Sequence, residues 1–319
     1  MKKFKLASIT ILAVFLVTMQ SCKKDEIEEN NDVSKEITNQ KQTRSSEQFE
    51  DINGISVKLD DSYNFGERTA SKWLYFETRD DYMNAIDQLS LGSDSALNSF
   101  ETTLSFSSMR VSKTENERES INIEDDLLAT LLNNDGRIRI GEQIFQIDAS
   151  NDTILVYNAN GTSRVRGFST DDDVFDILDG IDTGDEYRGC SSKNKPKAYN
   201  FYGNNIKCKV VYQKAGIYFS LLSKISKEGT GGDIYLSLDC TGYNGTDNYY
   251  IKKNKPNIIY SIGSSHKYGN KQNYIYRAYQ GCKRLINYHF LVYFNATNHN
   301  YPSNPPTLGP IALRIDCGQ

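Results

Sequence analysis

The sequence predicts an α+β N-terminal domain followed by an all-β antiparallel sandwich. Apolar residues in the first half follow helical and strand spacing in turn, whereas from Ala198 onward the spacing is two throughout. Charge divides similarly: the chain from Ser191 onward has seventeen basic and five acidic residues, a net charge of +12, while residues 23–190 carry −19. Sixteen of the 21 tyrosines also follow Ser191. This division is typical of two separately composed domains, expected at residues 55–188 and 189–319.

The first residues have the pattern of a secretory signal peptide. Three lysines within the first five residues precede an apolar run over residues 6–19. At about 1.5 Å per residue, this run spans roughly 20 Å, which is shorter than the ~30 Å hydrocarbon core of a bilayer. Cleavage is therefore expected in preference to a membrane-spanning anchor.

The end of this segment carries a family resemblance. Ser21-Cys22 resembles the lipobox of bacterial lipoproteins, although Met19 and Gln20 depart from the usual leucine and small residue. The following Lys23-Lys24-Asp25-Glu26 resembles the signal that sends Bacteroidetes lipoproteins to the outer face of the outer membrane. The resemblance implies a signal peptide at residues 1–21, lipidation of Cys22 and attachment to the outer membrane, because several acyl chains on one cysteine anchor a protein stably.

Residues 22–54 are expected to form a flexible acidic tether. They are rich in Glu, Asn, Gln, Ser and Lys, and Phe49 is their only aromatic residue. Such a segment buries too little apolar area to offset the entropy lost on ordering. As a random coil of ~30 residues it would reach roughly 30 Å from the membrane.

Helices and strands mix in the first domain. Thr78 followed by Asp81 predicts a helix start, and Asn133–Gly136 predicts a helix end. The charged segment 115–122 is expected to be a loop. Strands are expected over 55–59, 73–76, 138–140, 144–148 and 153–157, and helices after Thr78, from Ser93 or Asp94 to Leu104, and over 123–132.

Part of this domain resembles a known group of proteins. The resemblance rests on the Trp73–Phe76 strand, the helix after Thr78 and the run Leu131–Gly141. Together they resemble an N-terminal domain of unknown function that recurs in uncharacterised surface lipoproteins of gut Bacteroidetes, over about a third of the chain. The resemblance implies a location and carries no activity.

An acidic stretch closes the first domain. Eight acidic residues lie between Asp171 and Glu186, with Val174, Ile177 and Leu178 among them at helical spacing. Calcium binding would need six to eight oxygen ligands, and the stretch lacks the spacing of an EF-hand loop. An acidic amphipathic helix is the preferred interpretation, and no metal site is expected.

The second domain alternates strands with turns. Ile206, Cys208, Val210 and Tyr212 are expected to share one strand face, and further strands are expected over 217–225, 234–240, 249–253, 274–279, 286–294 and 311–317. Seven or eight short strands indicate a sandwich. Of the five cysteines beyond Cys22, Cys208, Cys240 and Cys317 fall on apolar strand phases, where they can form disulfides or stay buried thiols.

Catalytic constellations are absent from the sequence. His289 alternates with apolar neighbours as a sheet residue does, and His266 is expected in an exposed loop without a nucleophile elbow. The second domain has one glutamate and four aspartates, none in an evident pair for glycoside hydrolysis. Catalysis is therefore disfavoured, and no cofactor is expected.

Tyrosines and lysines are the candidate ligand-binding residues. The tyrosine rings can stack on sugars, while the lysine ammonium groups face an anionic partner. One alternative is that the tyrosines lie at the rim of the core and the lysines lie in solvent along edge strands. Another is that the second part of the chain, with its net charge of +12, packs against the first part, with its net charge of −19. The candidates are Tyr249, Tyr250, Tyr274, Tyr276, Lys252 and Lys267.

Two triplets resemble the O-glycosylation sites of Bacteroides secreted proteins. They are Asp94-Ser95-Ala96 and Asp152-Thr153-Ile154, with Ser95 and Thr153 as the acceptors. Both fall at predicted turns, where a glycan can be carried.

The sequence thus predicts a surface lipoprotein that acts as a non-catalytic binding or adhesion module, with an anionic or host glycan as its first candidate partner. A surface protein is another possible partner, and nucleic acid is not expected. The alternative functions are a surface hydrolase with a site between the domains and a structural subunit of a surface assembly.

Overall fold

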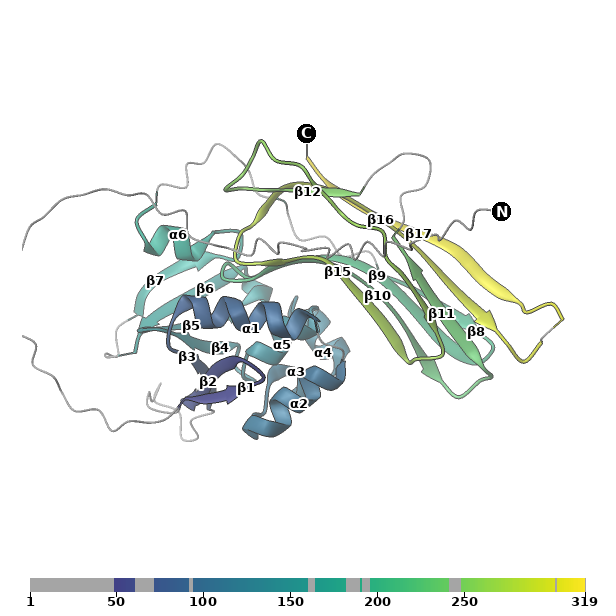
Figure 1. Ribbon diagram of the computed structural model, residues 1–319, viewed down its shortest axis with the longest axis horizontal. Helices are drawn as coiled ribbons and strands as arrows, with labels where there is room; N and C mark the ends of the chain where they lie inside the picture. Colours follow the sequence, from purple (N-terminus) through teal and green to yellow (C-terminus); the bar gives the residue numbers. More distant parts are fainter. Residues whose placement is uncertain are drawn as a thin grey trace, which may run out of the picture.

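The protein is mainly β, with several largely antiparallel sheets and few helices (Figure 1). The computed structural model describes residues 49–60, 72–91, 94–159, 164–181, 190, 196–240, 248–301 and 303–318. The signal segment and Cys22 lie outside the described residues, as does most of the predicted tether.

A seven-stranded sheet contains the first seven strands in chain order. All its neighbours pair antiparallel except β3 and β4, which are parallel. The strands predicted from period-two spacing are confirmed, and β1 adds three residues that were assigned to the tether. The strands are β1 (Glu50–Ile52), β2 (Ile55–Asp60), β3 (Trp73–Phe76), β4 (Arg137–Ile140), β5 (Gln143–Asp148), β6 (Thr153–Asn158) and β7 (Arg164–Ser169).

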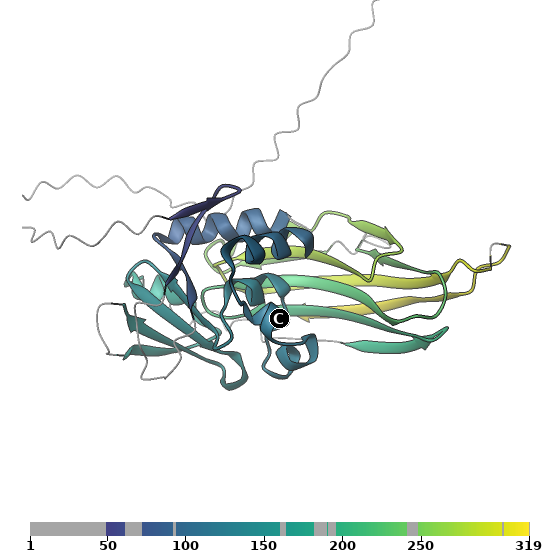
Figure 2. The ribbon, with the colours of Figure 1, turned by 90° about the horizontal axis from the view of Figure 1, so that it is seen from below.

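Five helices make the connection between the parallel strands β3 and β4. They lie between the first sheet and the long strands of the second half (Figure 1 and Figure 2). A short 3-10 helix (Ala149–Asn151) and α6 (Val174–Leu178) follow later in the chain. The five helices are α1 (Arg79–Leu91), α2 (Asp94–Leu104), α3 (Met109–Ser112), α4 (Glu115–Ser120) and α5 (Asp126–Leu131).

The start of α1 confirms the predicted cap. The Thr78 hydroxyl donates to the Asp81 carboxylate at 2.7 Å, and the Asp81 N–H donates back to the Thr78 hydroxyl at 3.1 Å. These bonds satisfy donors that the first helical turn leaves unpaired. The predicted stripe of Tyr82, Ile86 and Leu89 is buried.

The prediction of a loop over residues 115–122 is wrong, because Glu115–Ser120 forms α4. Thr114 and Glu117 make a full capping box, in which each side chain bonds the other residue's backbone N–H. Arg118 is buried and bonds Asp126 at 2.6 Å. Charges that suggested a solvated loop are therefore paired with other elements, as Arg118 of α4 is with Asp126 of α5.

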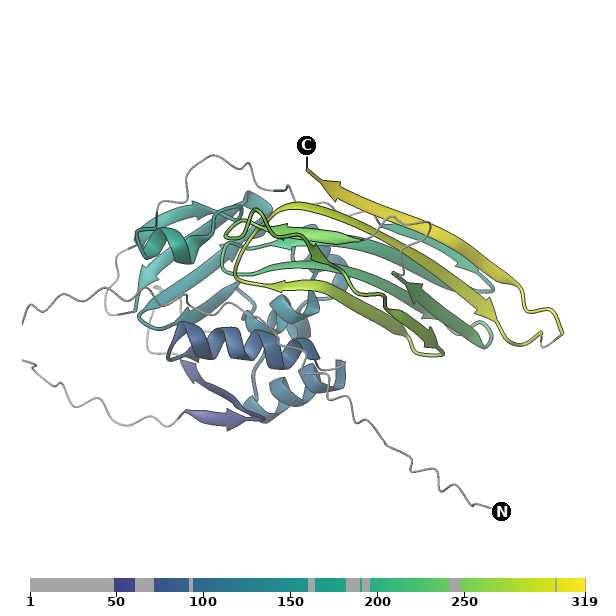
Figure 3. The ribbon, with the colours of Figure 1, turned by 45° about the horizontal axis from the view of Figure 1, so that its top comes forward.

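The second half forms two antiparallel sheets. One has the order β15-β10-β9-β8; the other has the order β13-β12-β16-β11-β14, with β17 paired to β16. Figure 3 shows β16 and β17 extending farthest from the helices. The strands are β8 (Lys197–Phe201), β9 (Asn204–Lys214), β10 (Phe219–Gly229), β11 (Ile234–Asp239), β12 (Tyr249–Lys252), β13 (Tyr260–Ser261), β14 (His266–Gly269), β15 (Asn273–Gly281), β16 (Leu285–Asn298) and β17 (Thr307–Cys317).

The two sheets enclose one apolar core. β9 contributes Ile206, Cys208, Val210 and Tyr212, so the predicted inward face is confirmed. β10, β11, β16 and β17 supply most of the rest. The expected loop at His266 is wrong: His266 opens the edge strand β14 opposite Asp239, and the apolar-poor sequence of this strand hid its pairing.

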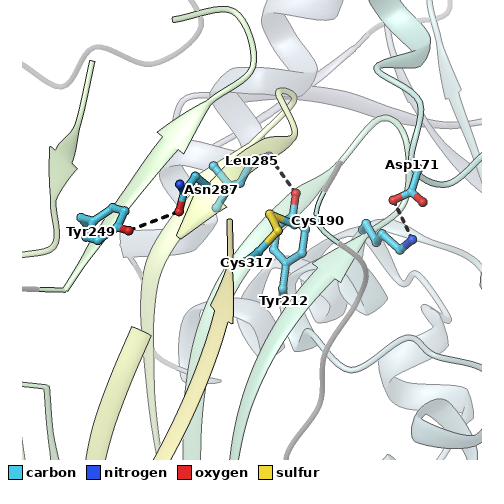
Figure 4. Close-up of a disulfide and its surroundings, with 8 residues drawn as sticks. Asp171, Cys190, Tyr212, Tyr249, Leu285, Asn287 and Cys317 are labelled. Carbon is cyan, nitrogen blue, oxygen red and sulfur yellow. Dashed lines mark hydrogen bonds and ion pairs between the residues drawn. A yellow bond between two sulfur atoms is a disulfide. The ribbon is translucent and has the colours of Figure 1, made fainter. Parts of the chain in front are cut away.

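A disulfide ties the two ends of the second half together. Cys190 bonds Cys317, the last residue of β17, and their Cα atoms lie 5.5 Å apart (Figure 4). Beside it, the Leu285 N–H donates to the Tyr212 hydroxyl at 2.8 Å. Cys208, Cys240 and Cys282 are buried and form no disulfide within the described part of the chain.

The β9–β10 turn extends into the core of the first half. Ala215, Ile217 and Tyr218 are buried among the apolar residues of the first sheet and its helices. Gly216 adopts a φ of +64°, and a Cβ at this position would lie 2.1 Å from the Ile154 side chain. Glycine is therefore required where this turn meets the first sheet.

Candidate binding cleft

Part of the opposite charge of the two halves is paired inside the molecule. Lys209 bonds Glu119 at 2.7 Å and Glu115 at 3.0 Å, and burial of its ammonium is outweighed by these carboxylates, so that its pKa is raised. Further pairs across the two halves are Lys214–Asp171, Lys224–Asp126, Arg277–Asp125 and Lys283–Asp176. The acidic stretch after Thr170 thus contacts bases of the second half, and much of the +12 charge is unavailable to a ligand.

Asp125 lies at the centre of this network. Its carboxylate is fully buried and accepts bonds from the Arg277 guanidinium at 2.8 Å and from the hydroxyls of Tyr218 and Ser220, each at 2.6 Å. Burial raises the pKa of Asp125, but Arg277 and the two hydroxyls outweigh it, so the pKa lies below its ordinary value. Asp125 therefore fixes α5 against β10 and β15.

A cleft of about 580 Å³ opens beside this network, between the end of α1, the start of α2 and the strands β14 and β15. β15 is the edge strand of its sheet, and β14 is the edge strand of the other. Within the part of the chain that the structure describes, the cleft therefore lies at the margins of both sheets. The cleft is lined by Ser90, Leu91, Asp94, Ser95, Leu97, Lys267, Lys271, Gln272, Asn273, Tyr274, Ile275, Tyr276, Arg277 and Gln280.

Two lysines give the cleft its positive charge. Lys267 Nζ donates to the Ile275 carbonyl at 2.7 Å, which links the two edge strands. Burial lowers the pKa of Lys267, and the charges of Arg277 and Lys271 lower it further, against an opposing effect of Asp94. Lys271 is exposed. A bound anion would relieve the repulsion between these ammonium groups.

Two tyrosines of β15, Tyr274 and Tyr276, line the cleft. The Tyr276 hydroxyl donates to the Gly263 carbonyl at 3.0 Å, and burial raises the pKa of Tyr276. Tyr274 is half-buried and packs against the core between the two sheets. Both rings are therefore held in place, and both residues contribute to the lining of the cleft.

Three of the six predicted ligand-binding residues line this cleft, namely Tyr274, Tyr276 and Lys267. The other three make contacts elsewhere. The Tyr250 ring stacks on Tyr260 at 5.1 Å, and Lys252 Nζ lies 5.0 Å from the centre of the Tyr260 ring. Tyr249 donates to Asn287 at 3.3 Å.

The helical wall of the cleft was missed from the sequence. Asp94 and Ser95 come from the first turn of α2, and Gln280 donates to Ser90 at 3.2 Å from the opposite side.

Ser95, a predicted glycosylation site, is exposed at this wall. Thr153, the other site, starts β6 and donates to the Asn151 carbonyl at 2.9 Å. The sequence signal at this wall is the predicted O-glycosylation triplet Asp94-Ser95-Ala96.

Two histidines, His266 of β14 and His289 of β16, lie on the outer face of the sheet that contains both strands. His266 Nδ1 is 3.5 Å from Asp239, and His289 Nδ1 is 2.7 Å from Asp316. No group of three or more His, Cys, Asp or Glu side chains suited to a metal ion occurs among the described residues. Within that same part of the chain, no helix is long and apolar enough to cross a membrane.

Comparison with known proteins gives one distant likeness. No protein-family model matches the chain, and no curated protein matches it. A solved structure of a DUF4848 family protein from Bacteroides thetaiotaomicron aligns with 82% of this chain and 100% of its own, at 10% identity and a TM-score of 0.21. At that TM-score, the likeness carries no argument about fold or function.

Proposed function

We propose that the protein is a non-catalytic glycan-binding module whose binding site is the cleft between α2 and β15, with an anionic glycan as ligand. The observation that carries the proposal is the joining of two lysines, two half-buried tyrosines and several amide side chains in one cleft. Tyrosine rings offer apolar faces to sugars and hydroxyls for hydrogen bonds. Lysines select ligands that carry carboxylate or sulfate groups.

Hydrolysis in this cleft is not favoured. Asp94 is the single carboxylate among the described residues that line it. Glycoside hydrolysis ordinarily uses two carboxyl groups on either side of the scissile bond. Binding without turnover is therefore the better proposal for this site.

Charge reversal at the cleft tests the proposal. The Lys271→Glu variant is expected to bind immobilised chondroitin sulfate and hyaluronan roughly tenfold more weakly than the natural protein, because an attraction becomes a repulsion. Affinity of the natural protein should also fall as salt is raised. The chain from Lys23 onward is used, because the two halves share buried ion pairs.

The control is Lys255→Glu, which makes the same charge change on the β12–β13 connection, outside the lining of the cleft. It should keep nearly the natural affinity. Equal losses in both variants would mean that net charge, and not the cleft, governs binding. No binding to either glycan at any salt concentration would refute the proposed function.

For the architecture, we infer an α+β unit at residues 55–188 followed by a β-sandwich at residues 189–319. The shared core of the two antiparallel sheets supports the sandwich. The single seven-stranded sheet with its five intervening helices supports the α+β unit.

For the location, we propose a lipid anchor at Cys22 on the outer membrane, exposed at the cell surface. The apolar run and Ser21-Cys22 support the anchor, and the Cys190–Cys317 disulfide fits an oxidising compartment.

Replacement of the lipidated residue tests this location. Cys22→Ser should abolish metabolic labelling by an alkyne-bearing fatty acid and move the protein out of the membrane fraction, because the acyl chains provide the attachment. Continued labelling of the variant would place the lipid elsewhere or exclude the anchor. Cys208→Ser, at a buried thiol, is the control and should label normally.

A further inference from the structure

A cluster of four aromatic rings, three exposed and one half-buried, lies on the outer face of the sheet that contains β11, β14 and β16. Tyr235 from β11, His266 and Tyr268 from β14, and His299 after β16 form this aromatic platform. The centres of the Tyr235 and His299 rings are 4.2 Å apart, and those of Tyr235 and Tyr268 are 5.4 Å apart. The rings are therefore one continuous surface.

The platform is accessible and held in place. Tyr268 is 49% exposed, and the His266 side chain is 58% exposed. The Tyr268 hydroxyl bonds His299 Nε2 at 2.7 Å, and His266 Nδ1 lies 3.5 Å from Asp239. Partly exposed rings with fixed orientations and polar atoms at their rims match the alternating apolar and hydroxyl-bearing surfaces of a sugar.

The platform adjoins the cleft through one strand. Successive side chains of a strand point to opposite faces. Lys267 of β14 therefore faces the cleft, while its neighbours His266 and Tyr268 belong to the platform. Because β14 is an edge strand among the described residues, the two surfaces are separated only by its backbone there, a width of about 5 Å.

We propose, resting on the proposed function, that the ligand is a glycan chain of several sugars that runs from the cleft around the β14 edge onto the aromatic platform. The cleft takes the anionic sugars beside Lys267 and Lys271. The platform takes the next sugars by stacking. A tetrasaccharide or a shorter fragment would occupy the cleft alone and gain nothing from the platform.

Chain length is the variable that tests this inference. The affinities of tetrasaccharides and dodecasaccharides of chondroitin sulfate and hyaluronan are measured by calorimetry. The natural protein should bind the dodecasaccharide at least roughly tenfold more tightly than the tetrasaccharide, beyond the statistical gain from repeated sites. Tyr268→Ala should remove most of this difference and leave tetrasaccharide binding unchanged.

The control is Tyr202→Ala, which removes a similarly exposed ring that packs on Phe201 and Tyr301. It should preserve the length dependence, and both variants should unfold at the natural temperature. Equal affinity for the two lengths, or no effect of Tyr268→Ala on the longer one, overturns the inference while the proposed function stands. No binding at either length for both glycans overturns the proposed function as well.

Discussion

Replacing Asp125 with alanine is expected to lower the free energy of unfolding by about 3–5 kcal/mol. The substitution removes a buried carboxylate that accepts bonds from Arg277, Tyr218 and Ser220. The Arg277 side chain, which is 10% exposed, then keeps its charge without its closest partner. Removing one member of a buried ion pair costs more than the pair contributes, since the other charge stays desolvated. Urea unfolding followed by circular dichroism measures the loss.

An exposed ion pair provides the control. Glu228 bonds Lys207 at 2.9 Å, with side chains that are 58% and 31% exposed. Because water screens such pairs, Glu228→Ala should cost less than about 1 kcal/mol. A comparable loss in the two variants would contradict the role assigned to burial. Partial recovery in the double variant Asp125→Leu/Arg277→Met would support it, since two apolar side chains need no compensation.

The pH dependence of unfolding supplies a second measurement of the same effect. The Asp125 carboxylate has a folded-state pKa below that of the unfolded chain. Its contribution is fully present above the ordinary aspartate pKa of about 4 and disappears as the pH falls through the lower folded value. The stability difference between the natural protein and Asp125→Asn should therefore shrink as the pH drops from 5 towards 2.

Strands whose apolar residues alternate were predictable from the sequence. In β9, burial depends on a spacing of two, and Ile206 through Tyr212 show it directly. β14 could not be found this way. Its sequence, His266–Gly269, pairs through the backbone with β11 and presents mostly polar side chains.

The helix α4 was not predicted from the sequence for a related reason. Its charges suggested a solvated loop, yet the Thr114–Glu117 pair is a capping box, a signal that can be read from sequence. Burial of Arg118 against Asp126 depends on how distant segments pack, which spacing alone does not reveal.

Composition predicted the charge division but not its use. The split between −19 and +12 suggested either an anionic ligand or contact between the halves. Bases such as Lys209 and Arg277 proved to face acids of the same chain, whereas Lys267 and Lys271 line the cleft. Which bases pair with acids and which line the cleft depends on where α2 and α4 lie against the sheets. Such tertiary contacts join residues too far apart in sequence for local patterns to specify.

Removing the Cys190–Cys317 disulfide is expected to lower the free energy of unfolding by about 2–5 kcal/mol. The bond closes a loop with a sequence separation of 127 and joins the end of β17 to Cys190, at the start of the second half. Such a long loop restricts the unfolded chain strongly, and on the chain-entropy model its closure contributes about 4–5 kcal/mol. The variant Cys190→Ser/Cys317→Ser, in the chain from Lys23 onward, measures the loss by urea unfolding.

Reductant gives this prediction an internal control. Dithiothreitol should lower the unfolding temperature of the natural protein and leave that of Cys190→Ser/Cys317→Ser unchanged, because Cys208, Cys240 and Cys282 form no disulfide among the described residues. An equal response of both proteins to reductant would mean that another disulfide exists. No response in the natural protein, together with a full count of five thiols after denaturation, would show that Cys190 and Cys317 are not bonded. The C-terminal end of the second half would then be held in place by the β16–β17 pairing and the shared core.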